Sequence, residues 1–205
     1  MNHIRPAIVM MLAMTLLTGL AYPLAVTAIA QLVFPWQANG SLLRRNATVI
    51  GAARIGQNFT SDRYFHPRPS ATTGPDPADP ARTIGVPYNG ANSAGSNLGP
   101  TSRELVRHVQ ARAAALAAQN PAVPVPVDLV TSSASGLDPD ITPAGALFQV
   151  PRVARARGLP VAVVRRLVLA HITPRLFGVI GEPHVNVLRL NLALDALAGT
   201  GHGAR

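Results

Sequence analysis

The segment Ala7–Phe34, AIVMMLAMTLLTGLAYPLAVTAIAQLVF, runs for 28 residues without a charged side chain and is the only such run in the chain. A helix of this length reaches roughly 42 Å at about 1.5 Å per residue, which exceeds the ~30 Å hydrocarbon core of a bilayer. We therefore predict a transmembrane helix over residues 7–34, preceded by a short cytoplasmic segment over residues 1–6.

A cleaved leader is the alternative explanation of the same apolar run. Arg5 provides a short basic start, and Ala28-Ile29-Ala30 fits a small-x-small cleavage site before Gln31. Against a leader, the run continues past that site to Phe34. Under both interpretations we expect the rest of the chain to lie outside the cytoplasm, because a long following domain tends to be translocated whatever its charge.

Small residues recur along the predicted helix and suggest a surface for close packing against a second helix. Helix association in lipid relies on packing, and small side chains let two backbones approach. The alternative is that Ala and Gly are simply frequent in this chain. One helix cannot enclose a transport path, so a transport role would require other subunits. The candidate packing positions are Thr15, Gly19, Ala21, Ala25 and Ala28.

The composition excludes several classes of function. The formal charge of +9 arises from 18 Arg and no Lys against 9 acidic residues, but the arginines are scattered and no nucleic-acid motif is present, so we expect no nucleic-acid partner. The absence of Lys rules out a Walker A loop. The absence of Cys rules out thiolate metal sites and a cysteine nucleophile.

The remainder of the chain predicts a single mixed α+β domain over residues 48–198, joined to the anchor by a linker over residues 35–47 and followed by a flexible tail over residues 199–205. Thr101 and Glu104 form a capping pair at the start of one predicted helix. The order of elements lacks the βαβ rhythm of a doubly wound sheet. Helices are expected over residues 101–119, 143–157, 160–171 and 190–197, and strands over 48–55, 123–130 and 184–188.

Chemistry-bearing motifs are weak. Ser93 lies in ANSAG, which is one Gly short of a nucleophile elbow and lacks a strand–turn–helix context. The glycine-rich loop over residues 89–99 is either an anion-binding concavity or a connecting loop. Asp138-Pro139-Asp140 is either a cation site or ordinary turn chemistry. The six His show no metal-ligand spacing. We expect no catalytic site, no metal and no directly bound cofactor.

Several unusual strings, in order along nearly the whole chain, resemble one family. It is the C subunit of the Kdp potassium-transporting ATPase. The strings are TLLTGLAYPL (Thr15–Leu24), FPWQANGS (Phe34–Ser41), YFHPRPSA (Tyr64–Ala71), YN (Tyr88–Asn89), GSNLGPT (Gly95–Thr101), SASGLDP (Ser133–Pro139), QVPRVA (Gln149–Ala154) and GEPHVNVL (Gly181–Leu188).

The resemblance implies an accessory subunit of a bacterial P-type pump, with an uncleaved single-pass anchor in the inner membrane and its domain outside. The implied partners are a K⁺-channel-like subunit, an ATP-hydrolysing subunit, a further small subunit of the Kdp complex and the lipid bilayer. The family's C subunit is described as raising the ATP affinity of the hydrolysing subunit. An external domain cannot touch a cytosolic nucleotide, so we expect ATP to act only through the hydrolysing subunit.

Two positions depart from the family pattern. Asp140 stands where we expect His after Leu-Asp-Pro, and His184 stands where Arg is common.

Our preferred mechanism is an external domain that sits over the ion entrance of the K⁺-conducting subunit. The residues expected in subunit-contact or structural loops are Asn89, Ser93, Ser96, Asn97, Ser135, Gly136, Asp138, Gln149, Arg152, Glu182 and Asn186.

Overall fold

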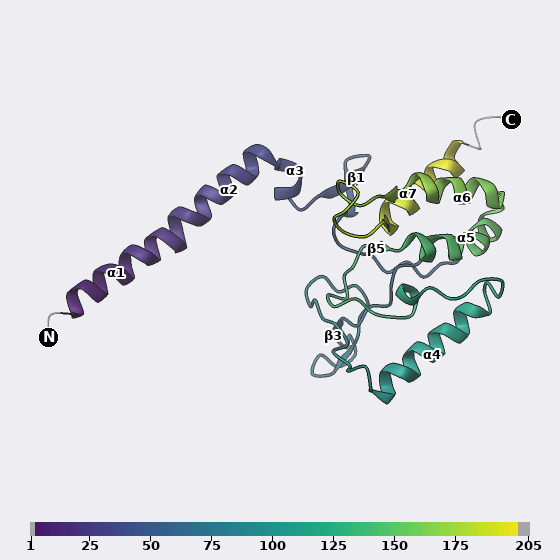
Figure 1. Ribbon diagram of the computed structural model, residues 1–205, viewed down its shortest axis with the longest axis horizontal. Coiled ribbons are helices and arrows are strands. Elements are labelled where there is room, and N and C mark those ends of the chain that lie inside the picture. The colour runs from purple at the N-terminus through teal and green to yellow at the C-terminus, as the bar shows by residue number, and fades with distance from the viewer. Residues whose placement is uncertain (1–2, 201–205) are drawn as a thin grey trace. The chain divides into compact units, whose positions relative to one another are not determined.

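The computed structural model describes residues 3–200 and divides into two compact units, Met1–Ala52 and Ala53–Arg205. The first unit holds one long apolar helix and a β-hairpin. The second holds a mixed domain of helices and short antiparallel strands (Figure 1). The α+β class predicted from the sequence is therefore confirmed.

The N-terminal helix is continuous over Ile4–Val33 and is long and apolar enough to cross a membrane. It consists of α1 (Ile4–Leu16), a π-helical turn η1 (Leu17–Ala21) and α2 (Tyr22–Val33). Pro23 explains the wide turn, because proline has no N–H to donate and its ring crowds the carbonyl four residues earlier, that of Gly19. None of the helix surface is buried within the described chain, so its apolar side chains require lipid or another protein.

A short helix and a hairpin follow the long helix within the first unit. Helix α3 (Pro35–Ala38) leads to strands β1 (Leu42–Arg45) and β2 (Thr48–Ala52), which pair antiparallel. Asn46 and Ala47 form the two-residue turn with positive φ of 49° and 68°, which suits the right-handed twist of a hairpin. The segment expected as a linker thus carries regular structure.

The core of the second unit lies among three helices and a three-stranded sheet. Helices α5 (Pro143–Arg157), α6 (Val161–Ala170) and α7 (Val187–Thr200) lie together in Figure 1, and α6 contacts both of the others. Strands β5 (Asp140–Ile141), β7 (His184–Asn186) and β6 (Ile172–Thr173) form an antiparallel sheet in that order. The buried cluster also takes in Phe65 from an irregular segment.

Local chemistry fixes both ends of α5. The Thr142 hydroxyl accepts the Gly145 N–H, and Pro143 occupies the first turn, where its missing N–H costs nothing. Gly158 ends the helix with a left-handed φ of 65°, and the Leu159 N–H bonds back to the Ala154 carbonyl. The helix expected over residues 143–157 is therefore observed with the same bounds.

The remaining elements are less tightly packed. Strands β3 (Thr73–Pro75) and β4 (Thr83–Gly85) form a small hairpin, and α4 (Arg103–Ala117) lies apart from the other helices of this unit (Figure 1). Ser102, not Thr101, caps α4 by accepting the Leu105 N–H at 3.4 Å.

Several elements differ in their bounds from the expectations, and one expected strand is absent from the described structure. The strand predicted over residues 123–130 is wrong, because the structure has a 3₁₀ turn, η2, over Val127–Leu129 instead. Pro124 and Pro126 supply no N–H for a ladder, so the alternating apolar residues cannot pair as a strand. Helix α7 continues to Thr200, two residues into the expected tail, and positions 201–205 lie outside the described residues.

Candidate functional site

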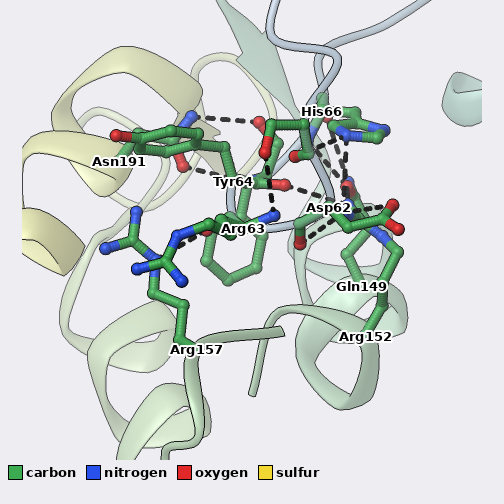
Figure 2. A network of polar contacts seen from close by, with 10 residues as sticks. Asp62, Arg63, Tyr64, His66, Gln149, Arg152, Arg157 and Asn191 are labelled. Atoms are coloured by element: carbon green, nitrogen blue, oxygen red, sulfur yellow. Dashed lines mark hydrogen bonds and ion pairs between the residues drawn. The ribbon is translucent and has the colours of Figure 1, made fainter. Parts of the chain in front are cut away.

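The most densely bonded polar site surrounds an irregular segment, residues 62–66, which begins in a turn closed by the Tyr64 N–H and the Ser61 carbonyl and is bonded to side chains of α5 and α7 (Figure 2). Two buried carboxamides each pair with both backbone groups of one residue. Asn191 on α7 accepts the Phe65 N–H at 2.9 Å and donates to the Phe65 carbonyl at 3.0 Å. Gln149 on α5 treats His66 in the same way, at 2.7 and 3.1 Å. The two carboxamides thus supply the hydrogen-bond partners that this irregular backbone does not find in a helix or sheet.

Two arginines of α5 bind the remaining carbonyls of residues 62–66. Arg152 donates to the Asp62 carbonyl at 2.8 Å and to the Tyr64 carbonyl at 3.0 Å. Arg157 donates to the Arg63 carbonyl at 2.7 Å. All five carbonyls from residue 62 to residue 66 therefore accept from side chains of α5 or α7. For the buried Phe65, this provides the partners that a buried backbone group requires.

Charge is arranged unevenly around this segment. The Arg157 guanidinium forms an ion pair with Asp195 at 2.8 Å and lies over the Tyr64 ring at 4.6 Å from its centre. Arg152 is more isolated, because the nearest carboxylate oxygen, on the exposed Asp62, is 3.5 Å away. Burial lowers the pKa of Arg152. Burial, and then the charge of Arg152, lowers the pKa of His66.

A second polar site joins the glycine-rich loop over residues 89–99 to the turn over residues 133–138, and we name it the two-loop junction. The Ser93 hydroxyl and the Ala94 N–H both donate to the Ser135 carbonyl at 3.0 Å. The Ser133 hydroxyl accepts the Gly136 N–H at 2.9 Å. The two loops expected from the sequence to matter are therefore in direct contact with each other.

Glycine is required where the two loops touch. A Cβ on Gly136 would lie 2.5 Å from the Ala94 carbonyl oxygen, and Gly136 has a φ of 66°. A Cβ on Gly95 would lie 2.7 Å from the Ala134 carbonyl oxygen. Real Cβ atoms do not approach backbone this closely, so the composition of both loops follows from their packing.

The segment over residues 68–72 is hydrogen-bonded to the two-loop junction and to the residues just before it. The Ser70 hydroxyl donates to the Gly136 carbonyl at 2.7 Å, and the Thr72 hydroxyl donates to the Val86 carbonyl at 2.6 Å. Tyr88 donates its hydroxyl proton to the Arg68 carbonyl at 2.7 Å. Burial, and then the charge of Asp138, raises the pKa of Tyr88 above its ordinary range, so the phenol stays protonated and keeps donating.

The other residues expected in subunit-contact or structural loops are either hydrogen-bonded within the domain or exposed to solvent. Asn89 donates to the Thr73 carbonyl at 2.7 Å, and Asp138 forms an ion pair with Arg68 at 2.9 Å. Ser96 and Asn97 are exposed at the outer edge of the two-loop junction. The remaining two are Glu182, which forms an exposed ion pair with Arg175, and Asn186, which donates to Asp140 and to the Ala53 carbonyl.

Asp140 and His184, the two positions expected to depart from the family pattern, face each other. His184 Nε2 lies 3.8 Å from the Asp140 carboxylate across the β5–β7 pair. The same carboxylate accepts from Asn186 at 2.9 Å, so all three side chains belong to one cluster on the sheet. A change at one of these positions alters the surroundings of the other.

A pocket of about 220 Å³ near this cluster gathers four of the nine acidic residues, but each already has a partner. Asp128 accepts the Thr142 N–H, Asp138 pairs with Arg68, and Asp140 and Glu182 are engaged as described above. Within residues 3–200, no three His, Asp or Glu side chains are placed to hold a metal ion. The cation site weighed for Asp138-Pro139-Asp140 gains no support from this arrangement.

The candidate packing positions of the long helix fall into two sets. Thr15 and Gly19 are four residues apart and share one side, as do Ala21 and Ala25. Gly19 and Ala21 are two residues apart, which places the sets on roughly opposite sides. The Thr15 hydroxyl donates to the Met11 carbonyl at 2.8 Å, so it is satisfied within the helix. Ala28 belongs to the side of Ala21 and Ala25.

The polar sites stabilise the fold, and some of their residues were not predicted from the sequence. The Ser93 hydroxyl donates to a backbone carbonyl, which is a structural bond and not the activation of a nucleophile. Asn191, Ser70 and Arg157 were not singled out, although Asn191 is almost completely buried. The available signal was a polar residue on the apolar face of a predicted helix, which usually marks a specific hydrogen bond.

The fold and these sites define a class: a single-pass membrane protein whose second unit is an α+β domain with an internal network of polar side chains. Comparison with known sequences specifies the family. The family described as K⁺-transporting ATPase, c chain (KdpC) matches residues 4–196. The chain belongs to this family.

Individual relatives agree over almost their full length. A protein of Rhodopseudomonas palustris strain BisB18 is 63% identical over 196 residues, covering 96% of this chain and 98% of the relative. A protein of Methylobacterium nodulans is 60% identical over 199 residues, covering 97% and 99%. Both are named potassium-transporting ATPase KdpC subunit. Because the family match begins at residue 4, it includes the long helix, and an exported domain with a cleaved leader is not favoured.

Proposed function

We propose that this chain is a non-catalytic accessory subunit of an ATP-driven potassium-uptake complex, required for assembly and stability. The observation that carries the proposal is the joint match of helix and domain, over residues 4–196, to the c chain of K⁺-transporting ATPases. Relatives about 60% identical over almost the whole chain carry the same subunit name. Their names describe a transporting ATPase, and the one helix of residues 3–200 that could cross a membrane cannot form a transport path by itself.

The helix Ile4–Val33 anchors the subunit in the inner membrane with its N-terminus in the cytoplasm and its domain outside. The helix docks on the K⁺-channel-like subunit, while the ATP-hydrolysing subunit and the further small subunit complete the complex. The uncovered apolar surface of the helix supports such docking, since lipid-facing and partner-facing sides can coexist on it. ATP acts through the hydrolysing subunit, because a domain outside the membrane has no access to cytosolic nucleotide.

The external domain sits over the ion entrance of the channel-like subunit and shapes ion access. Support comes from the two-loop junction, where backbone contacts and side-chain hydrogen bonds hold the loops in one geometry. A surface whose side chains are already fixed loses little conformational entropy when a partner binds. Ser96 and Asn97 are the exposed candidates at its edge.

Recovery of the tagged complex and growth in low K⁺ test this role. The wild-type chain should recover the other subunits and support growth, whereas a chain lacking residues 53–205, which keeps only the helix contact, should recover less of the complex and fail to support growth. Asn97→Ala should reduce both measures, while Asn58→Ala, at another exposed asparagine of the same domain, should not. Equal behaviour of the two variants would exclude a contact role for the loop edge.

The topology has its own test, because the chain contains no cysteine and a single introduced one reports without background. Ser96→Cys should react with an impermeant thiol reagent added outside intact cells. Labelling that requires membrane disruption would refute the external placement. N-terminal sequencing should find the intact start, and a mature protein beginning at Gln31 would restore the leader interpretation.

A further inference from the structure

The loop between β6 and β7 presents an unusual apolar tip, and we name residues 175–182 the apolar hairpin. Phe177 is 85% exposed and Val179 is 75% exposed, while Leu176 and Ile180 are each 59% exposed. A fully exposed Phe offers roughly 150–250 Å² of surface, so these four adjacent side chains form an apolar patch of several hundred Å². Patches of this size on a folded domain mark interaction sites.

The hairpin is held in a defined shape. Leu176 and Ile180 exchange both backbone hydrogen bonds, at 2.9 and 3.0 Å. Below them, one Arg175 nitrogen donates to both carboxylate oxygens of Glu182, at 2.7 and 2.6 Å. The pairing of Thr173 with His184 then fixes the base of the hairpin in the three-stranded sheet.

The backbone of the tip adopts a strained conformation that keeps the aromatic ring exposed. Phe177 has a φ of 53°, a left-handed value that is uncommon for a bulky residue, and Gly178 follows with 77°. This conformation holds the most exposed aromatic ring of the domain in water, where it gains no burial. Backbone outliers of this kind cluster at functional sites, so the conformation of Phe177 favours a functional role for the tip.

The charges of the hairpin distinguish a protein partner from a lipid surface. Arg175 and Glu182 are the only charged residues between Thr173 and His184, and they neutralise each other. Stable binding to an anionic membrane surface needs a cluster of basic residues beside the apolar side chains, and this tip has none. A neutral, rigid tip with one aromatic ring and three aliphatic side chains instead resembles the central anchor of a protein–protein interface.

We propose that the apolar hairpin docks into an apolar pocket on the extracytoplasmic surface of another subunit of the potassium-transporting ATPase complex. This inference rests on the proposed function, because it assumes that the chain assembles with such subunits. Phe177 and Val179 enter the pocket, and the Arg175–Glu182 pair lies at its polar rim. The hairpin is then a second attachment point beside the membrane helix.

A matched pair of valines tests the docking. Val179 is 75% exposed at the tip, and Val127 is 70% exposed in η2. Val179→Asp should speed dissociation of the detergent-purified complex about tenfold or more, because an aspartate would be desolvated inside an apolar pocket. Val127→Asp should leave dissociation unchanged. Equal dissociation of the two variants would overturn the proposal.

A single cysteine separates a protein pocket from lipid. Phe177→Cys, labelled with an environment-sensitive dye, is compared in the full chain alone in nanodiscs and in the assembled complex. The dye should be exposed to water when the chain is alone in nanodiscs and shielded from water in the assembled complex. Shielding in nanodiscs without the other subunits would indicate lipid insertion, and exposure in both samples would indicate no docking; either result overturns the proposal. Failure of the wild-type chain to recover any subunit would instead reject the proposed function itself.

Discussion

Removal of the Asn191 side chain should destabilise the second unit more than any change at a surface asparagine. Asn191 satisfies both backbone groups of Phe65, at 2.9 and 3.0 Å, and both residues are almost completely buried. In Asn191→Ala, an N–H and a carbonyl lose their partners in a site that water cannot readily reach. Each orphaned group costs about 1–3 kcal/mol, so the free energy of unfolding should fall by about 4 kcal/mol.

Two measurements follow this change in the full chain reconstituted in nanodiscs. A loss of about 4 kcal/mol in a domain of this size lowers the Tm by roughly 8–16 °C in a circular-dichroism melt. Hydrogen exchange followed by mass spectrometry should show the peptide that contains Phe65 opening about a thousandfold more often, since each 1.4 kcal/mol is a factor of ten.

A nearly isosteric variant and a surface control isolate the cause. Asn191→Asp keeps the volume and still accepts the Phe65 N–H, but it places an anionic oxygen against the Phe65 carbonyl, so it should destabilise at least as much as Ala. Asn58→Ala, on the surface of the same domain, should change stability by less than about 0.5 kcal/mol. If Asn191→Asp were as stable as the wild type, the carboxamide clamp would not be the source of stability.

Three other predictions concern neighbouring features. Gly136→Ala should cost about 2 kcal/mol or more, because its Cβ meets a carbonyl oxygen and its φ is positive, whereas Gly85→Ala, which meets nothing, should cost far less in the same melt. Burial lowers the pKa of His66 in the folded state, so the stability contributed by its neutral form is present above the unfolded pKa of about 6.5 and is lost as the pH falls below that value. His66→Asn should therefore flatten the fall in Tm between pH 7 and pH 5. An unchanged slope would contradict this. Arg152→Lys should cost about 2–3 kcal/mol in urea unfolding, because an ammonium cannot span both carbonyls; full stability would show that the bonds of Arg152 are dispensable.

The parts of the fold that local chemistry determines were predictable. A charge-free run of 28 residues predicted the long helix, and Pro143 at one end and Gly158 at the other bracket α5 as expected. The strand expected over residues 123–130 failed because alternation of valine and proline mimics a strand pattern. Proline removes the hydrogen bonds that a strand needs, so periodicity alone cannot decide such a segment.

The contacts between distant segments were only partly predictable. The glycine-rich loop was singled out by its composition and the turn at Ser135 by the family resemblance, and the structure shows that glycine permits their close approach. The pairing of Phe65 with Asn191 spans 126 residues of sequence and joins a side chain to a backbone. No periodicity encodes such a contact, because a helix pattern shows which face is buried but not which backbone lies opposite.

The places where apolar side chains remain uncovered indicate where this chain associates with other molecules. The buried polar residues that dominate the domain direct their hydrogen bonds to its own backbone, as Gln149 and Arg152 do for residues 62–66. A side chain in that position fixes the shape of the domain and has little capacity left for a partner. The long helix and the apolar hairpin show the reverse, since their apolar side chains have no internal cover. We therefore expect apolar surface at two separate places to drive assembly, and the β6–β7 pair and the Arg175–Glu182 ion pair to hold the second of them in shape.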